Sequence, residues 1–175
     1  RKTPLRVVSA YGTMPEAAGL LLHEFEQRWP QYAVMVEELS DVECDNAVEQ
    51  GRYELGFGVA PFDEAVFESR PLVTVRNCIV VHKDHPLAEL PAVNIEVLRG
   101  LPVMVMSEKF KATANLKQAC AKRGFEPNFV FCCSEASAIL RMAAQNLGVG
   151  ITIRSVAEDF HHPDVVAIPF EEPEM

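Results

Sequence analysis

The sequence lacks an excess of positive charge and a long hydrophobic run, and its first residues do not show the pattern of a signal peptide. Its formal net charge is −9. A negatively charged surface repels phosphate, so we expect that the chain itself does not bind DNA or RNA. No apolar stretch approaches the ~20 residues that a membrane helix needs. Arg1-Lys2-Thr3-Pro4 is not followed by an apolar core and a cleavage site of small residues, so we expect no signal peptide.

Cysteines are present but lack the spacing of disulfide or metal motifs. Their number is odd and no C-x-x-C occurs, which predicts free thiols in a reducing cytoplasm; they are Cys44, Cys78, Cys120, Cys132 and Cys133. A thiol redox switch would need Cys120 to meet Cys132 or Cys133, and their expected positions on a helix and a strand argue against easy pairing. His161-His162 has no cysteine pair at zinc-ligand spacing, so we expect no metal.

Motifs of catalysis are also lacking. The chain has no G-x-S-x-G elbow, no P-loop and no H-E-x-x-H. Gly56-Phe57-Gly58 does not open a helix, as a dinucleotide site requires. The Ser, His and Asp residues are scattered without the spacing of a triad. We therefore expect neither a cofactor nor an enzyme.

Strand and helix patterns alternate along the chain, which predicts an α/β fold with mainly parallel sheets. Long extended stretches at 71–82 and 165–170 are suited to cross between two lobes. We therefore predict two Rossmann-like lobes joined by two crossing strands. Residues 1–76 plus 166–175 would form lobe I, and residues 77–165 would form lobe II.

The apolar strand Cys78-Ile79-Val80-Val81 ends in the surface turn His82-Lys83-Asp84-His85-Pro86-Leu87-Ala88. This segment resembles the substrate-binding domain of LysR-type transcriptional regulators, in which a strand ending in "DHPLA" joins the two lobes. Other family segments are matched in the same order, at residues 5–10, 25–30, 51–58, 124–127 and 147–153. The departures are Trp29 in place of a Tyr and Glu54 in place of an Asp. The resemblance covers nearly the whole chain and implies a type 2 periplasmic-binding-protein-like fold. It also implies that part of the C-terminal end of lobe I lies outside this sequence.

Candidate binding loops follow the strands, because open α/β sheets bind ligands beyond the carboxyl ends of strands and at helix N-termini. The first loop is Tyr11-Gly12-Thr13-Met14, where Thr13 binds an effector or only caps its helix. The second is Ser40-Asp41, where Asp41 either caps a helix or faces the cleft and favours an amine or hydroxyl ligand.

The third loop is Met106-Ser107-Glu108-Lys109-Phe110-Lys111, whose lysines either pair with a ligand carboxylate or are solvated. Glu135-Ala136-Ser137 resembles the family's "E-x-S" and would line the same cleft. Val59 stands where some dicarboxylate-sensing members have an arginine, which argues against a carboxylate effector. The expected effector contacts are Tyr11, Gly12, Thr13, Met14, Asp41, Val59, Met106, Ser107, Lys109, Glu135 and Ser137.

The resemblance implies the effector-sensing domain of a LysR-type regulator, with a small-molecule inducer bound between the lobes. It implies a homodimer, a tetramer for the full-length protein, a cytoplasmic location and no membrane. DNA would be bound only by an N-terminal helix-turn-helix domain outside this sequence. Helix 15–29 and the helix after Lys109 are the expected dimer surfaces. The alternatives are a solute-binding receptor of a transporter with the same fold, and an enzyme for which only Asp41, Lys109 and Glu135 are available.

Overall fold

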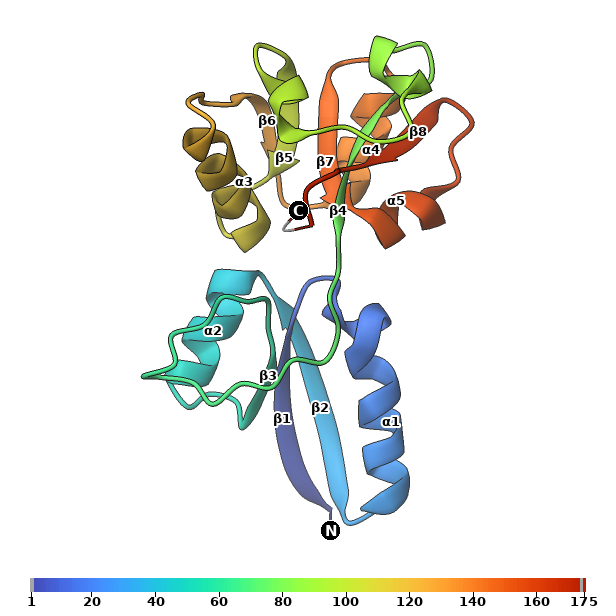
Figure 1. The fold of residues 1–175 in the computed structure, drawn as a ribbon. Coiled ribbons are helices and arrows are strands. Elements are labelled where there is room, and N and C mark those ends of the chain that lie inside the picture. The colour runs from blue at the N-terminus through green and yellow to red at the C-terminus, as the bar shows by residue number, and fades with distance from the viewer. Residues whose placement is uncertain (1, 174) are drawn as a thin grey trace. The chain divides into compact units, whose positions relative to one another are not determined.

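The structure is a computed structural model that describes residues 2–173 and 175. The chain forms two compact units, each an α/β layer structure (Figure 1). Unit 1 contains the residues up to Thr74 together with Lys109–Lys111, and unit 2 contains Val75–Glu108 and Ala112–Met175. The predicted α/β class is confirmed in both units.

Unit 1 is a three-stranded parallel sheet in the order β2-β1-β3. Its elements are β1 (Thr3–Ala10), a π-helical turn (Met14–Ala18), α1 (Gly19–Arg28), β2 (Tyr32–Leu39), α2 (Asp41–Glu49) and β3 (Leu55–Phe57). The central strand β1 ends in a run of four buried residues, because a parallel strand with helices on the sheet is covered on both faces. Val8, Ala10 and Cys44 form the core between the sheet and α2.

Unit 2 is a five-stranded mixed sheet in the order β6-β5-β7-β4-β8. Its strands are β4 (Asn77–His82), β5 (Pro102–Met106), β6 (Asn128–Cys133), β7 (Val149–Ile153) and β8 (Val165–Pro169). Its helices are α3 (Lys111–Lys122), α4 (Ala136–Ala144) and α5 (Arg154–Phe160), with two short 3-10 turns (Pro86–Glu89 and Ile95–Leu98). α5 was not predicted from the sequence.

The apolar strand β4 separates two hydrophobic cores of unit 2. Ile79 and Val81 belong to the core with Leu98 and Leu116, whereas Cys78 and Val80 belong to the core under α4. Successive side chains of a strand point to opposite faces of the sheet, so a continuous apolar run serves both cores. This explains why the strand shows no alternation of apolar and polar residues.

Gly150 of β7 is required by the packing of α4 on this sheet. A Cβ at this position would lie 2.4 Å from Cγ2 of Ile139 and 2.6 Å from Cγ2 of Val80. Both neighbours are fully buried β-branched side chains that have few alternative rotamers. The second glycine of Leu147-Gly148-Val149-Gly150 therefore allows helix and strand to approach closely.

The predicted lobe boundaries differ from the structure at three places, of which the first is that Val75 and Arg76, expected in lobe I, belong to unit 2. Residues 166–175 were expected in lobe I, but β8 pairs antiparallel with β4 from Cys78↔Pro169 to His82↔Val165 and so belongs to unit 2. The chain that follows is fixed there too, because a carboxylate oxygen of Glu172 accepts from the Ile95 N–H at 2.9 Å and from Arg123 Nη2 at 3.3 Å. Lys109–Lys111 were expected in lobe II and instead belong to unit 1.

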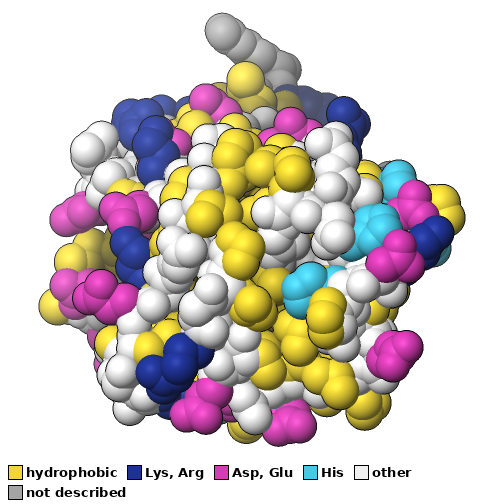
Figure 2. All heavy atoms as spheres, turned by 90° about the horizontal axis from the view of Figure 1, so that it is seen from above, with side chains coloured by type: hydrophobic (Ala, Val, Ile, Leu, Met, Phe, Trp, Pro, Cys, Tyr) yellow, Lys and Arg dark blue, Asp and Glu magenta, His cyan; other side chains and the backbone are white. Residues whose placement is uncertain are grey.

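Three histidines of unit 2 form the same local turn. Nδ1 of His82, His85 and His162 accepts the backbone N–H two residues later, from Asp84, Leu87 and Asp164, at 3.1–3.2 Å. Nδ1 must be unprotonated to accept these bonds. Histidines gather with charged side chains on one side of the face shown in Figure 2. The "DHPLA" segment is thus a strand end closed by side-chain-to-backbone hydrogen bonds.

Acidification should weaken unit 2 through His85. Burial lowers the pKa of His85, so its contribution to stability is present above the unfolded-state pKa of about 6.5 and is lost as the pH falls below it. His85→Asn keeps a side-chain acceptor for the Leu87 N–H and removes the titration. We expect the free energy of unfolding to fall less between about pH 7.5 and about pH 5.5, the range around the unfolded-state pKa, in H85N than in wild type. The check is urea unfolding at several pH values, with His23→Asn on the exposed face of α1 as control; equal slopes for wild type and H85N would refute the role.

Candidate functional site

In the loop after β1, the hydroxyl group of Thr13 forms hydrogen bonds with nearby residues of the same segment. Thr13 Oγ1 donates to the carbonyl of Ala10 at 2.8 Å and lies 2.5 Å from Ser9 Oγ. Thr13 makes no side-chain capping bond to its helix. Gly12 has a φ of +89°, a conformation that favours glycine. Tyr11 is half-exposed, with its ring centroid 6.2 Å from that of Phe110.

The loop after β2 places Ser40, and not Asp41, at the cap of α2. Ser40 and Glu43 form a capping box, in which Ser40 Oγ also donates to Glu43 Oε2 at 2.6 Å. Asp41 is the first residue of the helix and is buried. Its Oδ2 accepts the backbone N–H of Lys111 at 2.7 Å. Burial raises the pKa of Asp41, while the hydrogen bond from Lys111 opposes that rise.

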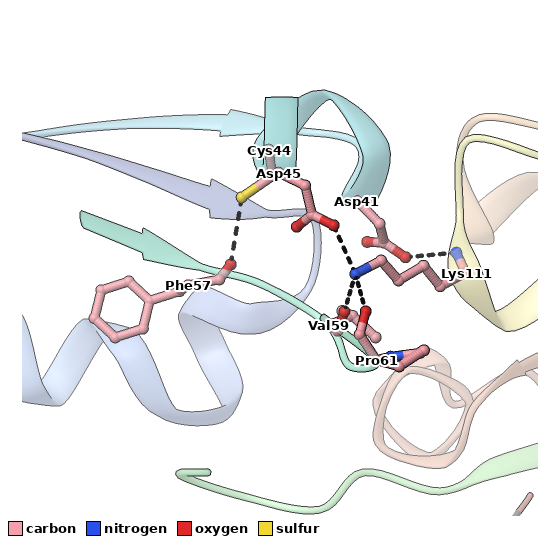
Figure 3. A network of polar contacts seen from close by, with 7 residues as sticks. All are labelled: Asp41, Cys44, Asp45, Phe57, Val59, Pro61 and Lys111. Carbon is pink, nitrogen blue, oxygen red and sulfur yellow. Dashed lines mark hydrogen bonds and ion pairs between the residues drawn. The ribbon is translucent and has the colours of Figure 1, made fainter. Parts of the chain in front are cut away.

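Lys111 is the centre of the polar network in unit 1 (Figure 3). Its Nζ lies 2.7 Å from Asp45 Oδ2 and donates to the carbonyls of Val59 at 2.5 Å and Pro61 at 2.7 Å. Nζ also lies 4.3 Å from the ring centroid of Phe62, a cation–π distance. An ammonium has three donors, so these three oxygens use all of them. Lys111 therefore keeps no donor for a ligand carboxylate.

Lys109 is held more loosely. Its Nζ pairs with Glu43 Oε1 at 2.8 Å, and 62% of its side chain is exposed. Its carbonyl accepts the N–H of Val42 in the first turn of α2 at 3.2 Å. Contacts with Lys109 and Ser40 lower the pKa of Glu43 to about 2. The main chain of Lys109 thus occupies a donor of the α2 N-terminus, while its side chain forms a surface ion pair.

In unit 2 the expected contacts lie at the ends of the neighbouring strands β5 and β6. The carbonyl of Met106 accepts from Thr113 Oγ1 at 2.8 Å, and the N–H of Ser107 donates to the Cys133 carbonyl at 2.6 Å. Ser107 Oγ is buried and has no hydrogen-bond partner among the described residues. Ser137 Oγ donates to the Glu135 carboxylate at the start of α4. The free hydroxyl of Ser107 is the feature here that fold stability does not explain.

The structure thus places the expected contacts in two sets. Unit 1 holds Tyr11, Gly12, Thr13, Met14, Asp41, Val59 and Lys109, and unit 2 holds Met106, Ser107, Glu135 and Ser137. Asp41 and Val59 come together because both accept hydrogen bonds from Lys111. Lys111 was considered for ligand pairing but was not among the expected contacts. The sequence spacing of Asp45, Val59 and Lys111 gives no sign that they meet.

The cysteines are free in the structure. Burial raises the pKa of the Cys44 thiol to about 11 and that of Cys78 to about 12, which leaves both thiols protonated near neutral pH. Among residues 2–173 and 175, no cluster of three or more His, Cys, Asp or Glu side chains is arranged to hold a metal ion. Within the same residues, no helix has the length and apolar character needed to cross a membrane.

Lys111 should be more important for stability than Lys109. Lys111→Met leaves Asp45 and two carbonyls without their cation, in a place where only 15% of the lysine and 22% of the aspartate side chain are exposed. We expect a loss of about 2–3 kcal/mol in the free energy of unfolding. The matched variant Lys109→Met breaks an exposed pair and should cost less than about 1 kcal/mol. Urea unfolding of both variants checks this, and equal losses would show that the network is not what stabilises unit 1.

Comparison with known proteins places this geometry in a family. The family described as "LysR substrate binding domain" matches residues 1–175. The chain is 26% identical over 153 residues to the uncharacterized HTH-type transcriptional regulator YwbI of Bacillus subtilis, covering 87% of this chain and 51% of that protein. It is 27% identical over 151 residues to the HTH-type regulator CysB of Haemophilus influenzae, covering 85% and 46%. The chain therefore spans about half the length of these curated relatives.

The fold is that of solved effector-binding domains. The effector-binding domain of QuiR, solved in complex with shikimate, superposes with a TM-score of 0.86 at 14% identity, covering 99% of this chain and 83% of that one. The predicted type 2 periplasmic-binding-protein-like fold is confirmed by this likeness. The prediction that the chain is not an enzyme agrees with relatives that are transcriptional regulators. The match over residues 1–175 shows that this chain belongs to the LysR substrate-binding domain family.

Proposed function

We propose that the chain is the effector-sensing domain of a LysR-type transcriptional regulator and binds a small-molecule inducer at its strand-end loops. The observation that carries this proposal is the family match over residues 1–175. The relatives are HTH-type regulators, which favours this function over a solute-binding receptor of a transporter.

The effector contacts are those expected from the sequence, and among them the hydroxyl of Ser107 would form a hydrogen bond with the effector. A buried hydroxyl without a hydrogen bond costs free energy, and a ligand acceptor or donor would remove that cost. Lys111 holds the loop of unit 1 in place and does not contact the ligand, since its donors are used. The pairing of Lys109 with Glu43 and the burial of Asp41 favour a neutral or hydroxyl-bearing effector over an anion.

Regulation follows from differential affinity. A ligand shifts a conformational equilibrium only by binding one state more tightly than another. We propose that the domain acts in the cytoplasm as a homodimer, and as a tetramer in the whole regulator. Leu20 and Leu21 on α1 are exposed, which suits the expected dimer surface on α1, with α3 as the second surface. DNA is contacted by a helix-turn-helix domain on the N-terminal side, in keeping with the net charge of −9 on this chain.

The test combines a ligand screen with one variant. Thermal unfolding of the whole regulator is followed with a panel of small metabolites, and a true effector at ~100 times its Kd should stabilise it by about 2.7 kcal/mol. Ser107→Ala should weaken that effector about 5- to 10-fold, in line with the loss of a hydrogen bond. Stability without ligand should not fall, because Ser107 Oγ has no partner among the described residues.

The matched control is Ser69→Ala, at an exposed position of unit 1, which should change neither quantity. The same effector must also alter binding of the whole regulator to its operator DNA. A compound that binds without changing DNA binding would favour the solute receptor. If the affinity for the effector were the same in S107A as in wild type, Ser107 would not be an effector contact.

A further inference from the structure

An aromatic groove in unit 1 lies outside the strand-end loops. It has a volume of about 420 Å³ and is lined by Leu5, Phe25, Trp29, Gln31 and Tyr32. The Phe25 ring centroid lies 5.0 Å from that of Trp29 and 5.7 Å from that of Tyr32. Trp29, which ends α1, remains 43% exposed. A surface of this kind, with large apolar side chains and one amide, is typical of contact sites for another segment of chain.

The start of the domain lies at this groove. The backbone N–H of Thr3 donates to the carbonyl of Gln31 at 2.8 Å, and Thr3 is the register partner of Tyr32. Leu5, two residues later on the same strand, lines the groove. Figure 1 shows the beginning of β1 beside the connection between α1 and β2. A chain that enters β1 from a preceding domain must therefore pass the groove.

We propose that, in the whole regulator, the segment that leads into Thr3 docks in this groove and covers the ring of Trp29. This inference rests on the proposed function, which places a DNA-binding domain on the N-terminal side of this chain. The relatives, whose matched part is about half of their length, are HTH-type regulators. Docking fixes the connecting segment on α1 and β2. A conformational change in unit 1 would then be transmitted to the DNA-binding domain, because the linker between them is immobilised and not flexible.

Trp29 supplies the first measurement, because it is the only tryptophan of this chain. In the whole regulator, the fluorescence emission of Trp29 is obtained by subtracting the spectrum of the Trp29→Phe variant from the spectrum of wild type. We expect emission at the blue-shifted wavelength of a buried indole and protection from acrylamide. Emission and quenching typical of a water-exposed indole would overturn the docking. Protection that disappears on dilution would also overturn it, because the occupant would then be a second copy of the chain.

The second measurement is limited proteolysis of the segment before Thr3 in the whole regulator. Trp29→Glu places a charge that cannot be desolvated in an apolar groove, and we expect cleavage about fivefold faster because the undocked form is more populated. Trp29→Phe should keep the wild-type rate. Leu147→Glu, at an exposed leucine of unit 2, is the matched control and should also cleave at the wild-type rate.

The outcomes separate the two proposals. If the regulator binds operator DNA and responds to its effector, but wild type and W29E are cleaved at equal rates, only the docking proposal is refuted. A whole protein without a DNA-binding domain before Thr3 loses both the docking and the proposed function. If W29E does not fold, the emission and quenching of wild-type Trp29 still decide the question.

Discussion

The ammonium of Lys111 joins three segments of unit 1 that are far apart in sequence. The ammonium pairs with Asp45 on α2 and donates to two carbonyls of the chain after β3. The backbone N–H of Lys111 donates to the carboxylate of Asp41. Charge-assisted hydrogen bonds are about twice as strong as neutral ones, and this ammonium uses every donor it has. The chain after β2 and the chain after β3 are therefore held in one arrangement by Lys111, the first residue of α3, which belongs to unit 1.

Because Lys111 and Lys109 are both paired with acidic side chains of α2, the strand-end loops of unit 1 contain paired charges. Under the proposed function, the groups left for recognition are neutral: the exposed ring of Tyr11 in unit 1 and the hydroxyl of Ser107 in unit 2. Ligand pockets commonly combine apolar walls with a few well-placed polar groups. A neutral, hydroxyl-bearing effector suits such a set better than an anion that would have to separate an ion pair.

Unit 2 depends on a different constraint, the burial of β4 on both faces. Its apolar run supplies two cores at once, and its neighbours β7 and β8 run antiparallel to it. The strand ends at a turn in which Nδ1 of His82 and Nδ1 of His85 each accept a backbone N–H. In the segment that carries the family resemblance, protonation of His85 at Nδ1 would remove its bond to the Leu87 N–H.

The sequence by itself determined the α/β class, the apolar strand at 78–81, the extended segment at 165–170 and the candidate loops, because apolar periodicity and Gly and Pro punctuation are local signals. It did not predict α5, the pairing of β8 with β4, or Ser40 as the cap in place of Asp41. Only tertiary structure decided that Lys111 belongs with Asp45 and Val59, since contacts between distant segments leave no local pattern. The Ser107 hydroxyl, without a hydrogen-bond partner in the part of the chain that the structure describes, and the groove at Trp29 likewise exist only once the strands are assembled.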